Sequence, residues 1–329
     1  MQKLAVLDAV AAKINKQHGA GIVQRHVEPQ QWRRVATGSV GLDVATHGGL
    51  PQGSVIELYG EESTGKTTLA LNVAAEIQRR GGVVLWVDTE HSFDSAYAQA
   101  IGLDLQGDLW IFSQPDSAEA AMDTIIAFAE SGYVQLIVLD SVAALTPEAE
   151  LDADSVSDAT IGLTARLLSR SLRQLVHVLR QHDAIFLAIN QVRDKIGYMA
   201  NGGKTTPGGR ALKFYSNMRV QVRATGQVKD QNEVVGIDIL ALVKKNRTGA
   251  PFREATYTIR FGEGIDRAGE ILDLGVEQGF LRREGAWYSY QGTKMQGREN
   301  MRRWLKDNPP ILDALHQAVL TGEAPHADE

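Results

Sequence analysis

A glycine-rich stretch near the start of the chain constrains the fold more than any other feature. Residues 60–67, the P-loop, read Gly-Glu-Glu-Ser-Thr-Gly-Lys-Thr and fit G-x-x-x-x-G-K-[ST] at every position. An apolar run, Val55–Tyr59, precedes the loop, and a helical pattern, Lys66–Arg80, follows it. In such a unit, backbone N–H groups point at phosphate oxygens, and the positive end of the helix adds to their field. The stretch therefore predicts a nucleoside triphosphate site rather than a chance glycine turn.

The P-loop supplies most of the expected contacts to ATP and its metal ion. Lys66 would reach the β- and γ-phosphates, and the Thr67 hydroxyl would bind Mg²⁺. Asp140 ends the apolar run Leu136–Leu139 and is the expected second metal ligand, on a strand beside the P-loop strand. The alternative for Asp140 is a helix-capping role. The expected nucleotide contacts in this region are Gly60, Glu61, Glu62, Ser63, Thr64, Gly65, Lys66, Thr67 and Thr68.

A further carboxylate must orient or deprotonate the attacking water. Glu90 closely follows the apolar run Val83–Asp88, so we expect it at the carboxyl edge of the sheet, where ligands bind. Asp88 and Asp94 compete with Glu90 for this role on sequence alone.

Apolar runs and helical patterns alternate along residues 55–190, which is typical of parallel strands joined by helical crossovers. The expected helices include Asp94–Ile101, a helix capped by Asp116, and Gly162–Gln181. We therefore expect an α/β fold with a mostly parallel central sheet. Three later runs predict antiparallel strands that extend this sheet: Met218–Arg223, Val234–Lys245 and Ala255–Phe261.

Composition narrows the class of protein. The chain has 329 residues, a formal charge of −6 and no cysteine. This charge excludes a protein that binds nucleic acid through a uniformly basic surface, but it is compatible with a local basic groove. The lack of cysteine excludes disulfides and thiolate metal sites and fits the cytoplasm. No apolar run reaches the ~18 residues that would span a membrane, so we expect no membrane association.

Changes in pattern divide the chain into three expected parts. Residues 1–30 form an amphipathic N-terminal arm, which packs on its own domain or on a neighbouring subunit. Residues 31–266 form the ATPase core, and residues 267–329 form a small α+β C-terminal domain with a short acidic tail.

Motifs along almost the whole chain, from about residue 14 to 309, resemble those of the bacterial RecA recombinases. The P-loop alone indicates only an NTPase, whereas the joint set is specific to this family. The resemblance implies a RecA-type ATPase core that uses ATP and Mg²⁺, forms helical filaments of itself on single-stranded DNA, and catalyses homologous pairing and strand exchange in recombination, DNA repair and the SOS response. The motifs include Thr37-Gly38-Ser39, Asp88-Thr89-Glu90-His91, Asp140-Ser141-Val142-Ala143, Ile189-Asn190-Gln191-Val192-Arg193, Pro207-Gly208-Gly209-Arg210 and Gly285-Ala286-Trp287-Tyr288.

The resemblance assigns roles around the nucleotide. Glu90 looks like the family's catalytic glutamate, and Gln191 looks like the residue that senses the γ-phosphate. Asp94 and Tyr97 look like the contacts to adenine, with Tyr97 stacking on the base. Ser141 falls beside the metal-binding aspartate and is expected near the nucleotide.

Other residues match positions that act across a subunit interface. Lys245 and Arg247 match cations that reach the neighbour's triphosphate, which makes each ATP site complete only between two subunits. Phe261 stands where the family often has tyrosine near the neighbour's nucleotide. Without the resemblance, a solvated strand end would be the expectation for Lys245 and Arg247.

Two loops, at about residues 151–161 and 192–206, are the expected contacts to single-stranded DNA. Cations on or beside them would hold phosphates independently of sequence, and apolar side chains would wedge between bases. The expected DNA contacts are Arg166, Arg173, Val192, Arg193, Lys195, Ile196, Met199, Gly208, Gly209 and Arg210.

The C-terminal domain carries a second basic feature. Between Arg282 and Lys306 there are seven cations and two anions, and after Lys306 there are five acids and no Lys or Arg. This arrangement resembles the family's surface for double-stranded DNA with its acidic tail. We expect Trp287 and Trp304 in the domain core rather than stacked on bases.

Some positions depart from the usual bacterial pattern. Ala200 replaces a phenylalanine in the second DNA loop, and Lys204 lies at an altered loop tip. Leu240 and Leu242 stand where cations help to engage a LexA-type repressor, which counts against that partner. Two alternatives remain: another RecA-fold ATPase, such as a ring helicase or a clock-type kinase, and a non-catalytic DNA scaffold assembled by ATP.

Overall fold

The computed structural model describes residues 2–26, 31–152, 162–194, 204–230 and 232–323. It divides into two units, Met1–Arg33 and Arg34–Glu329. The first unit contains the helix α1, Gln2–His18, whose apolar side chains Leu4, Leu7 and Val10 are more than half exposed within the structure. Arg25, on the segment after α1, pairs with Asp8 at 2.6 Å and holds that segment against the helix.

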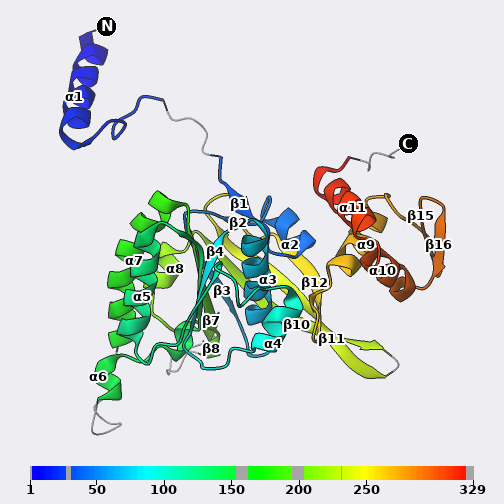
Figure 1. Cartoon of the computed structure of the whole chain (residues 1–329). Helices are drawn as coiled ribbons and strands as arrows, with labels where there is room; N and C mark the ends of the chain where they lie inside the picture. The colour runs from blue at the N-terminus through cyan, green and yellow to red at the C-terminus, as the bar shows by residue number, and fades with distance from the viewer. Residues whose placement is uncertain (1, 27–30, 153–161, 195–203, 231, 324–329) are drawn as a thin grey trace. The chain divides into compact units, whose positions relative to one another are not determined.

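Among the described residues of the second unit, nine strands form the central sheet, in the order β13-β12-β11-β10-β3-β7-β6-β4-β5. Figure 1 shows this sheet with the helices α3, α5 and α7 packed around it. The neighbours from β10 to β5 pair in parallel, whereas β11, β12 and β13 pair antiparallel. The bounds in this order are Gly264–Ile265, Glu254–Arg260, Glu233–Asn246, Met218–Asp230, Ser54–Gly60, Ile185–Gln191, Val134–Asp140, Val83–Asp88 and Trp110–Ser113.

The mostly parallel sheet confirms the predicted α/β fold, but two details of the strand order were wrong. The run from Met218 pairs in parallel with the P-loop strand β3 and is antiparallel only to β11. The strand β7 lies between β3 and β6, so the strand that ends in Asp140 is not the neighbour of the P-loop strand. Apolar runs alone do not specify strand order, because every buried parallel strand reads alike.

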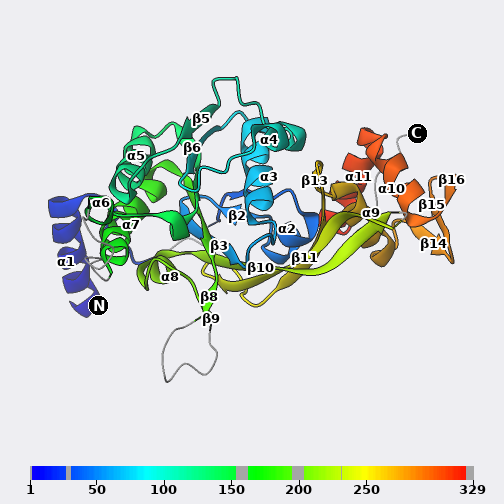
Figure 2. The ribbon, with the colours of Figure 1, turned by 90° about the horizontal axis from the view of Figure 1, so that it is seen from below.

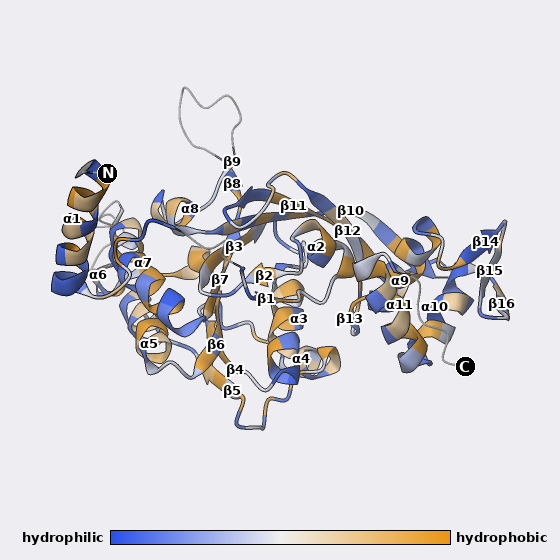
Figure 3. Cartoon of the chain, turned by 90° about the horizontal axis from the view of Figure 1, so that it is seen from above, coloured by the Kyte–Doolittle hydropathy of each residue, from blue (hydrophilic) through white to orange (hydrophobic). Residues whose placement is uncertain are grey.

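Helices cover both faces of the sheet, and each strand supplies alternate side chains to the two faces. Ile56, Trp86 and Val138 pack with α3 on one face, and Val55 and Leu139 pack with α5 and α7 on the other. Figure 3 shows the resulting concentration of apolar residues along the central strands. The helices are α2 Val40–Ala45, α3 Lys66–Arg79, α4 Ser95–Ile101, α5 Ala118–Ser131, α6 Glu148–Leu151, α7 Leu163–His182 and α8 Ala211–Tyr215.

The start of α5 differs from the expectation. Ser117, not Asp116, caps this helix, because its hydroxyl accepts the N–H of Ala120 at 3.1 Å. Glu119, whose spacing from Asp116 also suggests a capping box, instead accepts the N–H of Glu148 at 2.9 Å. Both residues suit caps, so the sequence alone did not distinguish them.

Short strand pairs complete the core. The strands β1, Arg34–Val35, and β2, Leu50–Pro51, form one antiparallel pair. The strands β8, Arg193–Asp194, and β9, Lys204–Thr205, form another, directly beyond the end of β7. The second expected DNA loop is therefore closed at its base by two paired strands.

The C-terminal elements gather beyond β11 and β12 (Figure 2) and build a hydrophobic core of their own. Leu272, Met301 and Leu315, from three different helices, are fully buried there. Trp304 packs against this core as expected, but Trp287 is 42% exposed, so its prediction as a core residue was wrong. The elements are α9 Arg267–Glu277, β14 Arg282–Glu284, β15 Trp287–Tyr290, β16 Thr293–Gln296, α10 Arg298–Lys306 and α11 Pro309–Thr321.

Candidate functional site

The P-loop forms the turn from β3 into α3, and its backbone leaves no room for side chains at two glycines. A Cβ on Gly60 would lie 2.2 Å from the carbonyl oxygen of Val222, a backbone atom of the adjacent strand. Gly65 has a φ of 75°, in the left-handed region, and a Cβ there would lie 2.2 Å from Ile259 Cδ1. The loop is therefore a concave backbone cradle at a helix N-terminus, which suits a phosphate chain.

The side chains that would hold a triphosphate and its cation converge at this cradle. Lys66 donates to the carbonyl oxygen of Glu61 at 2.5 Å, and burial lowers the pKa of its amine. The Thr67 hydroxyl donates to Asp140 Oδ2 at 2.8 Å. Although β7 lies between the P-loop strand β3 and the strand β6 that ends in Asp140, Thr67 and Asp140 are thus in contact, as two ligands of one ion must be.

The donor set fits Mg²⁺ in particular. Burial raises the pKa of Asp140 to about 6, because desolvation outweighs the Thr67 hydrogen bond and the charge of Lys66. A bound divalent cation would compensate for this desolvation. In the described ranges no three His, Cys, Asp or Glu residues cluster as metal ligands. Magnesium needs no such cluster, since it takes one or two protein oxygens and completes its shell with phosphate and water.

Glu90 lies where three strands end. Its Oε1 accepts hydrogen bonds from the Ser141 hydroxyl, just after β6, and from Gln191 Nε2, at the end of β7, the latter at 3.2 Å. The side chain itself is exposed, beside the P-loop edge of the sheet. Glu90, Ser141 and Gln191, three residues expected near the nucleotide, therefore form one hydrogen-bonded group.

The competing carboxylates have other tasks in this structure. Asp94 caps α4 and accepts the N–H of Tyr97 at 2.9 Å. Asp88 is 2% exposed and accepts N–H groups from the turn that carries Glu90. This arrangement favours Glu90 as the group that faces water.

Tyr97 and Thr68 meet at the side of the cradle. Their hydroxyl oxygens lie 3.0 Å apart, and burial raises the pKa of the Tyr97 phenol. The hydrogen bond between α3 and α4 therefore brings the expected adenine-stacking residue to the P-loop helix. Phe261, expected near a neighbour's nucleotide, is 56% exposed and directly follows β12.

Lys245 and Arg247 lie on different elements from the P-loop. Both bind carbonyl oxygens at the end of α8: Lys245 donates to Lys213 at 2.7 Å, and Arg247 donates to Phe214 at 3.0 Å. Burial lowers the pKa of Lys245 to about 8, with help from the charges of Arg247 and Arg219. The two cations therefore lie together at the end of α8, and the structure does not bring them to the P-loop of their own chain.

The expected DNA contacts fall in two described groups. Val192 donates to the carbonyl oxygen of Gly60 at 3.1 Å, and Arg193 donates to Gln191 at 3.3 Å, so both lie beside the ATP site. Arg166 and Arg210 line a shared cavity of about 480 Å³, and Arg173 is exposed two turns further along α7. Lys195, Ile196 and Met199 lie outside the described residues, as do Ala200 and most of the first loop, at 153–161.

Gly208 and Gly209 lie at the entry to α8, both at positive φ. A Cβ on Gly208 would lie 2.9 Å from Leu168 Cδ1, and one on Gly209 would lie 2.8 Å from Ala165 Cβ. These glycines therefore allow the segment before Arg210 to pack closely on α7. Their role in the structure is close packing, which their sequence motif did not reveal.

The C-terminal domain is less basic in three dimensions than in sequence. Arg302 is 4% exposed and pairs with Asp266 and Glu299, and Arg298 pairs with Asp273 at 2.7 Å. These guanidinium groups hold the domain together. The exposed cations Arg282 and Arg283, on β14, remain as candidates for a nucleic-acid surface.

Three polar residues to which the sequence assigned no role connect these parts. Asn190 donates to Glu57 at 3.1 Å and to the carbonyl oxygen of Pro207 at 3.1 Å. Glu57 is fully buried on β3 and pairs with Arg219 on β10. A charged residue inside the otherwise apolar P-loop strand was the available signal, because buried carboxylates are rare unless paired.

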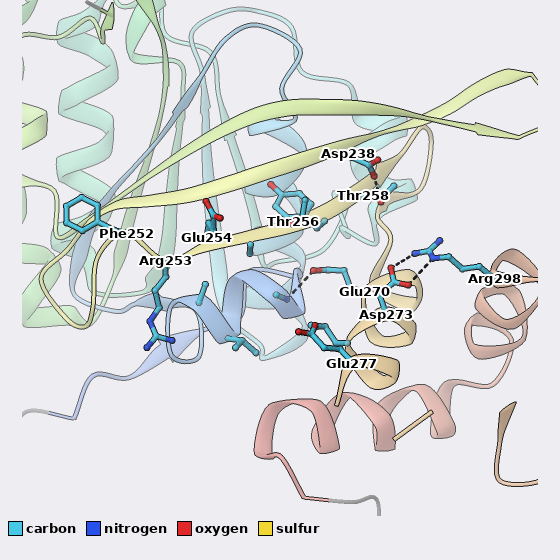
Figure 4. A pocket seen from close by; sticks show the side chains of 16 residues that line it. Asp238, Phe252, Arg253, Glu254, Thr256, Thr258, Glu270, Asp273, Glu277 and Arg298 are labelled. Carbon is cyan, nitrogen blue, oxygen red and sulfur yellow. Dashed lines mark hydrogen bonds and ion pairs between the residues drawn. The ribbon is translucent and has the colours of Figure 1, made fainter. Parts of the chain in front are cut away.

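A cavity of about 910 Å³ lies between β12, α2 and α9, and none of its lining residues belongs to the P-loop (Figure 4). Its buried residue Glu270 accepts the Ser39 hydroxyl at 2.7 Å and the Gly41 N–H at 3.1 Å, at the start of α2. Burial raises the pKa of Glu270 to about 8, against these hydrogen bonds. This cavity marks the joint between the core and the C-terminal helices rather than the phosphate site.

Comparisons with known proteins agree with this geometry. Residues 5–266 match the RecA N-terminal domain, and residues 269–322 match the RecA C-terminal domain. Protein RecA of Rubrobacter xylanophilus is 43% identical over 323 residues, 97% of this chain and 93% of that protein. Protein RecA of Haemophilus ducreyi is 44% identical over 97% of this chain and 86% of that protein, and Protein RecA of Caulobacter vibrioides is 44% identical over 96% and 89%.

In the part of the chain that the structure describes, no helix is long and apolar enough to cross a bilayer. The family match covers both the ATPase core and the C-terminal elements. The P-loop cradle, the Thr67–Asp140 contact and the Glu90 group stand within the first matched region. The chain therefore belongs to the RecA family of DNA-dependent ATPases, which act in homologous recombination and DNA repair.

Proposed function

We propose that this chain polymerises on single-stranded DNA in the cytoplasm and couples ATP hydrolysis to homologous pairing and strand exchange through the residues described above. The observation that carries this proposal is the contact of Glu90 with Gln191. Gln191 is the last residue of β7, and β8, which pairs with β9 at the base of the second expected DNA loop, begins two residues later. A change at the γ-phosphate that moves Gln191 would therefore reach the expected DNA loop through a single intervening residue, Val192.

The chain's own residues supply the parts of phosphoryl transfer. When ATP is bound, Thr67 and Asp140 would hold Mg²⁺, which would neutralise charge on the β- and γ-phosphates. Lys66 would release the carbonyl oxygen of Glu61 and bind phosphate instead, since both are oxygen acceptors. Glu90, held by Ser141 and Gln191, would orient the attacking water and accept its proton.

Filament formation would complete each ATP site. Lys245 and Arg247 donate to carbonyl oxygens of α8 in their own chain. In a filament, a neighbouring subunit's triphosphate would replace these neutral acceptors. The exposed apolar side chains of α1 support a second contact between subunits, in the N-terminal arm. In this scheme, ATP binding and filament assembly stabilise each other.

DNA would be held by charge on α7 and on the segment that enters α8. Arg166, Arg173 and Arg210 support phosphate contacts, and Arg193 would contribute at the base of the second loop. Arg282 and Arg283 support a weaker contact of the C-terminal domain with double-stranded DNA. The ring-helicase, clock-kinase and scaffold alternatives are not favoured, because the C-terminal elements also match the RecA family.

Steady-state ATP turnover with and without single-stranded DNA tests the proposal. The wild-type chain should hydrolyse ATP faster on DNA, and the stimulation should fall as salt rises, because phosphate contacts release counterions. Lys66→Ala should lose nucleotide binding, since the triphosphate loses its buried cation. Lys244→Ala, an exposed lysine on β11, is the control and should behave as wild type. Turnover without DNA stimulation, or unchanged ATP affinity in Lys66→Ala, would contradict the proposal.

A further inference from the structure

Asp88, the last residue of β4, accepts three hydrogen bonds from its surroundings. Its Oδ1 accepts the N–H of Glu90 at 3.1 Å, and its Oδ2 accepts the N–H of Phe93 and the side-chain amide of Gln114, each at 3.1 Å. The side chain is 2% exposed. A buried carboxylate of this kind persists only where N–H donors compensate its charge, so the three donors are part of one arrangement.

These bonds fix the turn that carries Glu90. The turn runs from the end of β4 to the start of α4, and it contains His91 with a φ of 52°, in the left-handed region. Its first residue is tied to the next strand, because the Thr89 N–H and hydroxyl donate to the carbonyl oxygens of Asp140 and Ser141 at 2.8 and 2.9 Å. Asp88 holds the interior of the same turn.

Aromatic packing fixes the far end of the turn. The Phe93 ring lies 5.5 Å from Trp86, 5.6 Å from Trp110 and 4.9 Å from Phe112, measured between ring centres. Trp86 belongs to β4, and the other two belong to β5. Gln114 directly follows β5, so its bond to Asp88 ties the turn to the same strand that supplies two of these rings.

We propose that Asp88 and Gln114 are positioning residues for Glu90. They act through the backbone of the turn, so that the Glu90 side chain reaches Ser141 and Gln191 and faces the water that attacks ATP. This inference rests on the proposed catalytic role of Glu90. Asp88 itself is a poor base for that water, because it is buried and both of its oxygens already accept N–H groups.

Two variants test this positioning. Asp88→Asn replaces one acceptor oxygen with an amide NH₂ group, which cannot accept an N–H, and Gln114→Ala removes one donor and leaves the carboxylates of Asp88 and Glu90 intact. Each should lower kcat for ATP by about 10- to 100-fold in the DNA-stimulated assay, the range expected when a reacting group is misplaced by up to an ångström. The KM for ATP should change by less than about threefold, because the P-loop contacts are untouched.

A matched control exists in the same domain. Asp104 accepts the N–H groups of Gln106 and Gly107 at 3.0 and 3.1 Å in a similar turn, but it holds no catalytic group. Asp104→Asn should keep the wild-type kcat. The near-ultraviolet circular dichroism of Trp86 and Trp110 should change in Asp88→Asn and Gln114→Ala but not in the control, because only these variants alter the hydrogen bonds at Asp88 Oδ2, which accepts the Phe93 N–H.

A double-mutant comparison separates a positioning role from a direct one. In a Glu90→Gln background, Gln114→Ala and Asp88→Asn should cause no further loss of the residual turnover, since the group that they position is already disabled. Wild-type kcat in both single variants, or the same fold loss with and without Glu90, would overturn the inference. Full turnover in Glu90→Gln alone would instead refute the proposed catalytic role of Glu90. If Asp88→Asn does not fold, Gln114→Ala decides the question.

Discussion

Mixed filaments give the sharpest test of the cations that would act between subunits. Lys245→Ala removes the ammonium group that lies on the α8 carbonyl oxygens and keeps Glu90, whereas Glu90→Gln removes the proposed base and keeps Lys245. Alone, each variant should be almost inactive, because a cation supplied in trans contributes about 10³-fold or more to phosphoryl transfer. Neither change touches the P-loop, so both variants should still bind ATP.

The expected gain in the mixture follows from the head-to-tail contact of a filament. In a 1:1 random mixture, a junction is intact where a Lys245→Ala subunit supplies Glu90 and its neighbour, a Glu90→Gln subunit, supplies Lys245. This applies to about one quarter of the junctions, so the mixture should recover about a quarter of the wild-type turnover.

ATP turnover on single-stranded DNA, measured at a fixed total protein concentration across mixing ratios, provides the assay. A bell-shaped dependence with its maximum near equal amounts is expected. A mixture of Glu90→Gln with Lys244→Ala should instead fall linearly, because Lys244 is exposed on β11 and is assigned no role at the junction. A rate equal to the average of the separate variants at every ratio would refute a role for Lys245 in trans.

Two further changes probe the cradle and the joint to the C-terminal domain. Gly60→Ala should abolish ATP binding, because its Cβ would lie 2.2 Å from the carbonyl oxygen of Val222, whereas Gly226→Ala, whose nearest contact is 3.4 Å, should bind ATP as wild type does in an equilibrium titration. The raised pKa of Glu270, about 8, predicts that its contribution to stability is complete below the ordinary carboxyl pKa and falls as pH rises towards 8. In Glu270→Gln, urea unfolding should therefore show a shallower loss of stability between pH 5 and 8, by up to about 1.4 kcal/mol per pH unit. An identical pH slope in both proteins would contradict this pKa.

The sequence predicted most of the elements because each followed a local rule. The P-loop motif, the apolar strands and the helix expected over Asp94–Ile101 all depend on neighbours in the chain. The strand order did not follow such a rule, so the position of β7 between the P-loop strand and the Asp140 strand was missed. The predicted pairing of Thr67 with Asp140 nevertheless agrees with the geometry, because both lie at the same edge of the sheet.

Charge was the least predictable part of the site. The count of charged residues in the sequence predicted a strongly basic C-terminal domain. In the structure, however, Arg302 is buried and pairs with Asp266, which is distant in sequence, and with Glu299, which is three residues away. Conversely, Asp88 read as a competitor for catalysis, and only its three N–H partners show that it holds the turn. A charged side chain either pairs with another residue inside the fold or stays exposed, where it can bind a ligand. Which of these occurs depends on its tertiary contacts, and a single sequence does not reveal them.

The hydrogen bond from the Val192 N–H to the Gly60 carbonyl oxygen directly connects the first residue after β7 to the first residue of the P-loop. Arg193, the next residue, pairs with Thr205, so β8 and β9 are joined to each other directly beyond this bond. Any tightening of the cradle around a phosphate chain would therefore be passed through Val192 to the paired strands at the base of the second loop.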